Sequence, residues 1–461
     1  MQYLADTPLT AAPRYLPQPA LFADQHGWTW RDVHEASLAL AQRLEGANTV
    51  CNLCGSRVGF LVAWLASLRR GCLQLLPPSG GHTDLAAILQ SSASPVIVVD
   101  DENLLQPHWS DHARCIVHRP QVPSASAPDA GLAWSPDWDA PSIRLYTSGS
   151  TGAPEPQTKT LGEFCRGALV LAARLDEVVE GGTAGLRQIV CSVPPQHMFG
   201  VETSVMLPLV TGIPVIDRRP LLAADVHAAF RDAPGEGAWI ATPLHLSALA
   251  RSGQEVPRCR LVLVSTMPLA PGLAEQAETL ARAPVMEIYG STETGVVAMR
   301  RTARQAHWRP VDGVRIEPAP DGAQVWGTHF ASPRILADQV ELDGEGGFRL
   351  LGRQADLIKI AGRRASLAGL NLLLQDLPGL VDGVFYLPAT GSPTERLVLI
   401  HAGAPLDRAA TRRWLRERMD PAFLPRTIIE VERLPRTDAG KLTRAALDAI
   451  YAAKNPKAVG R

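Results

Sequence analysis

The 461-residue chain lacks several features that mark large protein classes. Its seven cysteines are odd in number and have no framework spacing, which indicates a reducing compartment rather than a disulfide-stapled fold. Cys51 and Cys54 form a lone CxxC without a second pair, so the sequence predicts a buried strand there and no zinc site. The longest apolar run, 58–68, is too short to span a bilayer.

The chain also has no large excess of positive or negative charge, because its formal net charge is −1. This near-neutral balance argues against a general nucleic-acid binder. The balance is uneven, however: residues 354–461 contain 17 Lys and Arg against 11 Asp and Glu. Such a basic part suits an acidic partner or a phosphorylated ligand, although a solvated basic helix at 412–418 explains the excess equally well. The first residues do not resemble a signal peptide, so we expect a cytoplasmic protein.

The order of sequence patterns predicts the fold class. Between residues 28 and 288, helical apolar spacing alternates with short β-branched runs such as 95–99, which predicts an α/β fold with layered, mainly parallel sheets and helices. From Trp308 the chain changes to short strands and turns, typical of a small β-rich subdomain. We therefore expect a large N-terminal domain, 1–353, and a small mobile α+β C-terminal domain, 354–461.

One segment consists only of glycine, serine and threonine, and follows an apolar stretch that ends at Tyr146. Such a loop can present backbone N–H groups and hydroxyls to phosphate oxygens, because glycine permits the backbone conformations that turn successive amides inward. It lacks the Gly-Lys-Ser/Thr ending of a Walker A loop, which disfavours a P-loop kinase. The residues of this phosphate loop are Thr147, Ser148, Gly149, Ser150, Thr151 and Gly152.

Four further features follow the phosphate loop in a fixed order. They are His197-Met198-Phe199-Gly200, Tyr289-Gly290-Ser291-Thr292-Glu293, Asp338 fifteen residues before Arg353, and a turn with Gly440-Lys441. Together with the loop, they make the chain resemble the adenylate-forming superfamily of acyl-CoA synthetases, aryl-CoA ligases and carrier-protein adenylation domains. Singly, His197 could be a core histidine and Glu293 a helix-start residue, but the joint order favours the functional interpretation.

The resemblance implies an acid–thiol ligase that uses ATP and Mg²⁺ to convert a carboxylic acid into acyl-AMP. Attack of a carboxylate on the α-phosphorus joins two negative groups, so cations are most useful in the transition state. Lys441 would bridge these two groups, and the phosphate loop would hold the β- and γ-phosphates. The other implied roles are Thr292 for the α-phosphate, Glu293 for Mg²⁺, Tyr289 and Gly290 for adenine, and Asp338 and Arg353 for the ribose.

The resemblance also implies an acyl pocket beside His197, which would act as a swinging gate for the thiol. Relatives that activate amino acids carry an aspartate where this chain has Met198, so a buried ammonium would lack its counter-charge. An uncharged aryl or aliphatic acid is therefore expected. Ser265 and Met267 resemble another wall of the acyl pocket.

The acceptor implied by the resemblance is the thiol of CoA or of a phosphopantetheine on a carrier protein. Lys359 and Gly362 match the loop that swings in to line the thiol tunnel. The basic C-terminal part favours an acidic acyl carrier protein as partner. The free-standing aryl- or fatty acyl-CoA ligase is the alternative.

Two departures from the family pattern bear on activity. Glu155 stands where the family has a lysine, so we expect it to point outward and Lys159 to supply the cation. Ala355 stands where the family's hinge has Asp or Lys. The C-terminal domain can still rotate with alanine at this position, because a hinge needs permissive backbone torsions and no specific side chain. Both departures leave open a degenerate member that binds nucleotide without turnover.

Overall fold

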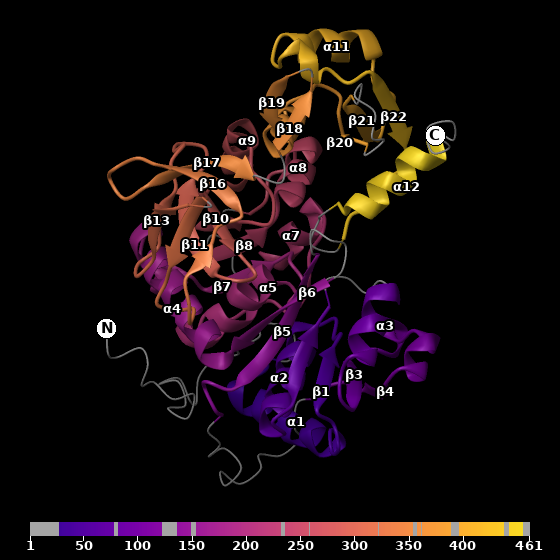
Figure 1. Cartoon of the computed structure of the whole chain (residues 1–461). Helices are drawn as coiled ribbons and strands as arrows, with labels where there is room; N and C mark the ends of the chain where they lie inside the picture. Colours follow the sequence, from indigo (N-terminus) through magenta and orange to yellow (C-terminus); the bar gives the residue numbers. More distant parts are fainter. Residues whose placement is uncertain are drawn as a thin grey trace.

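The computed structural model describes residues 27–77, 82–121, 136–148, 154–231, 236–257, 259–320, 322–353, 357–360, 362–388, 396–437 and 442–454. Within these ranges, two six-stranded sheets form the larger part of the molecule (Figure 1). Their strand orders are β4-β3-β1-β2-β5-β6 and β12-β11-β10-β9-β8-β7.

The first sheet is parallel from β4 to β5, and β6 joins it antiparallel to β5. Cys51 is buried in β1, which confirms the predicted buried strand. The strands are β1 (Thr49–Asn52), β2 (Leu73–Leu76), β3 (Pro95–Val99), β4 (Arg114–Val117), β5 (Pro141–Ser148) and β6 (Pro154–Thr160).

The second sheet is parallel from β7 to β10, and β11 and β12 follow antiparallel. The prediction of mainly parallel sheets is therefore confirmed. Residues 214–217 are a short β-branched run like 95–99 and also predict a strand, but this prediction is wrong. Pro214 has no N–H to donate, and only Val215 forms a bridge, with Ile189. The strands are β7 (Gln188–Cys191), β8 (Gly237–Ala241), β9 (Leu261–Val264), β10 (Val285–Ser291), β11 (Gly295–Arg301) and β12 (Arg309–Pro310).

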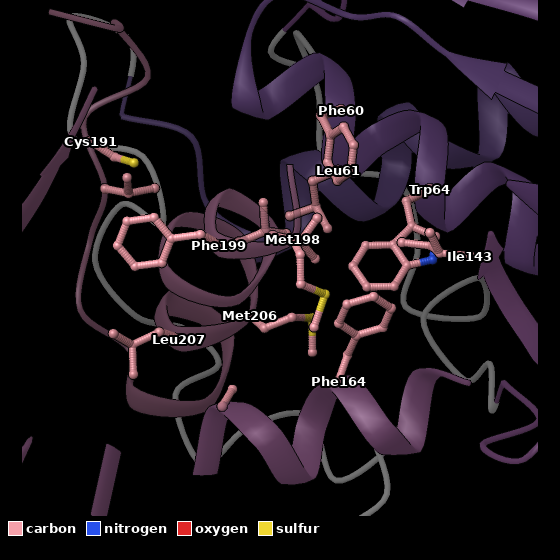
Figure 2. Close-up of a cluster of buried hydrophobic side chains, with 14 of the residues drawn as sticks. Phe60, Leu61, Trp64, Ile143, Phe164, Cys191, Met198, Phe199, Met206 and Leu207 are labelled. Atoms are coloured by element: carbon pink, nitrogen blue, oxygen red, sulfur yellow. The ribbon is translucent and has the colours of Figure 1, made fainter. Parts of the chain in front are cut away.

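Helices pack between and around these sheets. Figure 2 shows side chains from α2, α4 and the segment after residue 197 meeting in one apolar cluster, with Phe164 beside Trp64. The rings of these two residues lie 5.5 Å apart, and Trp64 Nε1 donates to Ser142 Oγ at 2.8 Å. The helices are α1 (Trp30–Arg43), α2 (Arg57–Arg69), α3 (His82–Gln90), α4 (Leu161–Val178), α5 (Met198–Val201), α6 (Leu207–Thr211), α7 (Ala223–Ala229), α8 (Pro243–Ser252) and α9 (Pro271–Ala281).

Helix starts follow the local sequence. Thr29 caps α1 in a reciprocal capping box with Asp32, and Thr160 caps α4 in the same way with Glu163. A π-helical segment, η6 (Glu202–Met206), separates α5 from α6. Although π-helical insertions are rare, many of those known lie at functional sites, so η6 is a candidate part of the site.

A small β-rich region follows the second sheet, as the sequence predicts. Its three-stranded and two-stranded sheets share a core in which Trp308, Val325 and Phe348 are buried. The strands are β13 (Arg315–Ala319), β14 (Gly322–Trp326), β15 (Arg334–Ile335), β16 (Asp338–Leu342) and β17 (Phe348–Arg353).

The C-terminal part forms its own sheets and cores, at the end of the molecule that carries α11 in Figure 1. It contains β18 (Leu357–Ile360), β19 (Arg363–Ser366), α10 (Leu367–Leu374), β20 (Asp382–Tyr386), β21 (Val398–Ala402), α11 (Arg408–Arg416), β22 (Thr427–Val431) and α12 (Arg444–Lys454). The α/β class with a large N-terminal part and a smaller α+β C-terminal part is thus confirmed. The boundary at residue 353 and the mobility of the C-terminal part stay predictions.

Among the described helices, none is long and apolar enough to cross a membrane.

Candidate functional site

The phosphate loop joins two strands of an antiparallel hairpin. Thr147 pairs with Glu155 and Ser148 with Pro154, at the tip of β5 and β6. Gly149, Ser150, Thr151 and Gly152 lie outside the described residues, as do the side chains of Thr147 and Ser148. Glu155 is exposed, in agreement with the expectation that it points outward.

A second hairpin, β10–β11, carries Thr292 and Glu293 in its turn. Ser291 N donates to Thr294 Oγ1 at 3.2 Å, and Thr294 N donates to Ser291 Oγ at 3.3 Å, so the turn is fixed by its own hydroxyls. Gly290 is required beside it, because a Cβ there would overlap the Gly295 carbonyl oxygen. Thr292 and Glu293 are both half-buried at this tip.

Lys159 connects the two hairpins. Its side chain, on β6, is only 4% exposed, and its Nζ donates to the Glu293 carbonyl oxygen at 2.9 Å. Burial lowers the pKa of Lys159, while the nearby carboxylates of Glu163 and Glu202 act in the opposite direction. The residue expected to supply a cation is therefore beside the Thr292–Glu293 turn, and its contact with phosphate stays a prediction.

Tyr289 and Asp338, the residues predicted to contact the nucleoside, meet directly. Tyr289 Oη donates to Asp338 Oδ2 at 2.9 Å, and the tyrosine ring lies 5.6 Å from that of Trp308 and 5.8 Å from that of Phe348. Asp338 pairs with Arg353 across the antiparallel strands β16 and β17, so the fifteen-residue interval between the two residues is the span of one hairpin. The side chain of Arg353 is outside the described residues.

His197 has a structural contact of its own. It is the N-cap of α5, and its Nδ1 accepts a hydrogen bond from Phe199 N at 3.3 Å. Met198 points into the apolar cluster of Figure 2 and is 6% exposed. Gly200 is required because a Cβ there would overlap the Pro194 carbonyl oxygen. The gating role of His197 stays a prediction.

The loop with Ser265 and Met267 is held from two sides. Ser265 Oγ donates to the Ile288 carbonyl oxygen of β10 at 3.0 Å, and Met267 Sδ accepts from Arg436 Nη1 at 3.8 Å. Thr266 between them has φ of 84°, a left-handed conformation that a β-branched residue rarely adopts. Strain of this kind is common at ligand-binding sites.

Lys441 and the hinge residue Ala355 lie outside the described residues. The chain on either side of Lys441 forms a bridge between Arg436 and Leu442, and Arg436 is the residue that contacts Met267. The base of the Lys441 turn therefore stands against the predicted wall of the acyl pocket.

The two residues of the predicted thiol-side loop lie together in the C-terminal part. Lys359 is exposed on β18, and Gly362 has φ of 80° in the turn to β19. The left-handed turn explains the glycine. The structure therefore brings them into one exposed hairpin, and their contact with a thiol stays a prediction.

Sequence reasoning missed Glu202. This carboxyl begins the π-helical segment, is 6% exposed, and accepts a hydrogen bond at Oε1 from Val296 N at 3.3 Å. Burial raises the pKa of Glu202 to about 7, although Lys159 and the Val296 hydrogen bond lower it. An acid within the apolar run 198–209 was the sequence signal that could have revealed it.

A family model described as AMP-binding enzyme matches residues 10–321 of the chain. The chain belongs to this family of adenylate-forming enzymes. It is an adenylate-forming acid–thiol ligase that depends on ATP. The predicted site residues from Thr147 to Glu293 fall within the matched range.

Two curated relatives indicate the breadth of the family. The chain is 28% identical over 306 residues to 4-coumarate–CoA ligase of Cereibacter sphaeroides, covering 64% of this chain and 69% of that protein. It is 24% identical over 515 residues to enterobactin synthase component F of Shigella flexneri, covering 93% of this chain. The chain spans only 38% of the length of that second relative.

Solved structures share the fold over almost the whole chain. The o-succinylbenzoate CoA synthetase of Bacillus subtilis with its acyl-adenylate intermediate has a TM-score of 0.79 at 19% identity, covering 96% of this chain and 98% of that one. A benzoate CoA ligase of Burkholderia xenovorans has a TM-score of 0.74 at 18% identity, covering 97% and 99%.

Proposed function

We propose that the chain activates an uncharged aryl or aliphatic carboxylic acid with ATP and transfers the acyl group to the phosphopantetheine thiol of an acyl carrier protein. The observation that carries the first step is the contact between Lys159 Nζ and the Glu293 carbonyl oxygen. It holds the hairpin of the phosphate loop against the turn with Thr292 and Glu293, so the groups expected at the triphosphate converge.

In the first half-reaction, a carboxylate oxygen attacks the α-phosphorus, and pyrophosphate leaves. The phosphate loop and Lys159 would bind the departing phosphates, and Thr292 would hold the α-phosphate. Lys441 would neutralise the attacking carboxylate from a turn whose base is at Met267. Tyr289 and Asp338, already hydrogen-bonded, would orient adenine and ribose.

Glu293 fits a role in binding Mg²⁺. This ion is commonly held by one or two carboxylates together with substrate phosphates, and the half-buried Glu293 stands at the tip where the phosphates are expected. When bound, Mg²⁺ would neutralise phosphate charge.

Met198 supports an uncharged acid. Its side chain is buried among apolar residues, where a substrate ammonium would have no carboxylate supplied from position 198. The names of relatives that act on coumarate, o-succinylbenzoate and benzoate support an aryl acid in particular.

An arginine groove in the C-terminal part supports a carrier protein as acceptor. It has a volume of about 480 Å³ and is lined by Arg396, Arg412, Arg416, Pro421, Ala422, Leu424, Pro425 and Arg426. Because its charged lining residues are all arginines, it complements an acidic protein surface. The match to enterobactin synthase component F over 93% of this chain supports the same acceptor.

CoA is the second candidate, favoured by the several relatives that are CoA ligases. In either case the C-terminal part would turn after adenylation, withdrawing Lys441 and presenting Lys359 and Gly362 to the thiol. The thiol sulfur would then attack the acyl carbon of acyl-AMP, so that AMP leaves and the thiol proton is released. We also place the reaction in the cytoplasm, since all seven cysteines lie in the described part of the chain and are free thiols.

Carboxylate-dependent exchange of pyrophosphate into ATP tests the activation step. We expect exchange with at least one acid from a panel of benzoates, cinnamates and fatty acids. Absence of exchange with the entire panel would contradict catalysis and leave the nucleotide-binding degenerate member.

The acceptor is tested by acylation of CoA and of acidic carrier proteins. Reversing charge in the groove with Arg412→Glu and Arg416→Glu should lower kcat/KM for the carrier protein at least roughly tenfold and leave exchange unchanged. Arg433→Glu, an exposed arginine outside the groove lining, is the matched control. Equal losses in the groove and control variants would reject the groove as a docking site.

A further inference from the structure

Arg57 is a buried cation at the junction of the two six-stranded sheets. It is the first residue of α2, which follows β1 of the first sheet, and it is only 1% exposed. Its Nη2 donates to the carbonyl oxygens of Cys191 at 2.6 Å and Val193 at 2.9 Å, at the end of β7 in the second sheet. Its Nη1 donates to the carbonyl oxygens of Asp217 at 3.1 Å and Arg218 at 3.4 Å. One planar donor group therefore holds two separate backbone segments.

The backbone of Arg57 is also fixed from both sides of the junction. Asp217 Oδ1 accepts a hydrogen bond from Arg57 N at 2.5 Å. On the side of the first sheet, Asp100 accepts from Gly55 N at 2.6 Å and from Ser56 N at 2.8 Å. Carboxylates are favourable at this end of a helix, because the helix dipole is positive there. The arginine therefore cannot move with one sheet without disturbing its contacts to the other.

The segment that Arg57 holds leads directly to His197. Pro194 and Pro195 have no N–H to donate, so the carbonyl oxygens and side chains of this segment must supply its contacts. Gln196 provides one such contact, since its Nε2 donates to the carbonyl oxygen of Cys54, just before α2. The loop before α2 and the first residue of that helix therefore locate the chain that ends at His197.

The residues predicted to bind ATP lie away from this segment. β7 is the last strand in the order β10-β9-β8-β7, whereas Tyr289 is on β10 and Asp338 is on β16. Thr292 and Glu293 are in the turn after β10. A shift of the segment after β7 would therefore move the predicted acid side of the site and leave the nucleotide side in place.

A buried guanidinium at this position needs a physical reason. Transfer of a cation from water to a protein interior is costly, and an apolar side chain of similar volume is often at least as stable there. Stability alone therefore does not account for Arg57. A requirement for defined geometry does, because a guanidinium donates to several carbonyl oxygens in fixed directions.

We propose that Arg57 is a positioning residue for the carboxylic acid, and that it holds the segment leading to His197 and Met198 in place against α2. The inference rests on the proposed acid activation and adds to it a residue outside the predicted acyl pocket. Side chains of α2 meet Met198 in the apolar cluster of Figure 2, so the placement of the segment relative to α2 sets where an acid would lie. An error of about 1 Å in such a placement can lower a rate about 100-fold.

Pyrophosphate exchange tests this proposal, with the best acid from the panel of benzoates, cinnamates and fatty acids and with rates referred to the number of ATP-binding sites. Arg57→Met keeps much of the side-chain length and removes every donor. We expect kcat/KM for the acid to fall about 10- to 100-fold, mainly through a higher KM, while Kd for ATP changes less than about twofold. A general loss of folded enzyme would instead lower the number of ATP-binding sites and leave KM for the acid unchanged.

Arg57→Lys decides the question if Arg57→Met does not fold. Lysine keeps the positive charge, but one ammonium does not reproduce the planar donor fork toward both segments, so KM for the acid should rise to an intermediate value. Gln196→Ala removes the other contact and should also raise KM for the acid. Arg70→Met, at the exposed C-terminal end of α2, is the matched control and should change neither KM for the acid nor Kd for ATP.

The proposal is overturned if the folded Arg57 variants keep the KM of the unmodified enzyme for the acid. It is also overturned if ATP binding weakens in parallel with acid binding, since the arginine would then support the whole site. Absence of exchange with every carboxylic acid by the unmodified enzyme is a different result, because it rejects the proposed function itself.

Discussion

At the residue scale, the amine of Lys159 links two structures that are far apart in the sequence. It is buried on β6 and donates to the backbone of Glu293, 134 positions later. We expect Lys159→Met, which keeps most of the side-chain length, to lower kcat/KM for pyrophosphate exchange by about 10- to 100-fold, the usual contribution of a hydrogen bond from a charged group. ATP titrations should show weaker nucleotide binding.

Lys454→Met, an exposed lysine on α12, is the control for this variant and should leave exchange unchanged. Thermal unfolding of both variants separates a loss of folding from a loss of binding. A folded Lys159→Met enzyme with normal exchange would show that the amine has only a structural role.

Sequence reasoning named residues for the nucleotide side but could not supply their contacts with one another. Tyr289 and Asp338 are both expected near the nucleoside, and the structure adds the hydrogen bond between them. Glu202 could not be placed in this way, because one acid in an apolar run has no spacing pattern. Its environment is created by Gly167 and Gly295, which come from other elements.

At the element scale, the π-helical segment makes stability depend on pH. The pKa of Glu202 is about 7 in the folded protein against an ordinary value of 4.5, so between these values the folded state retains a proton that the unfolded chain releases. Stability therefore falls as pH rises through this window, by up to roughly 3 kcal/mol in the free energy of unfolding.

Urea unfolding of the unmodified protein and of Glu202→Gln between pH 4.5 and 8 checks this prediction. The comparison is needed because the pKa of His329 is lowered to about 4, which makes stability rise with pH between about 4 and its ordinary value of 6.5. The stability of the unmodified protein relative to Glu202→Gln should fall across the range. Parallel curves for the two proteins would contradict a protonated Glu202 in the fold.

Elements with strong periodicity were predictable, and the hairpins that carry the site were not. The strand 95–99 agrees with its sequence pattern. In contrast, β6 contains Pro154 and Pro156 and little apolar alternation, so its sequence does not indicate a strand. It forms because pairing with the buried β5 compensates for the weak local preference.

At the scale of the whole molecule, the C-terminal part contacts the loop beside the predicted acyl pocket. Gln375 Nε2 donates to the Pro268 carbonyl oxygen at 3.1 Å, and Gln375 Oε1 accepts from Ala270 N at 3.0 Å. Arg251 Nη1 adds a third bond, to the Val381 carbonyl oxygen at 2.8 Å. These contacts favour the arrangement in which the base of the Lys441 turn lies against Met267, the one expected for adenylation.

Gln375→Ala removes both amide contacts and should shift the C-terminal part away from this arrangement. At about 1 kcal/mol for each exposed hydrogen bond, we expect pyrophosphate exchange to fall about 5- to 30-fold. Acyl transfer from supplied acyl-AMP should be unchanged or faster, since that step needs Lys441 withdrawn. Gln254→Ala, an exposed amide just after α8, should affect neither half-reaction. Equal loss of both half-reactions in Gln375→Ala would mean that the contact stabilises the protein generally and does not select one arrangement.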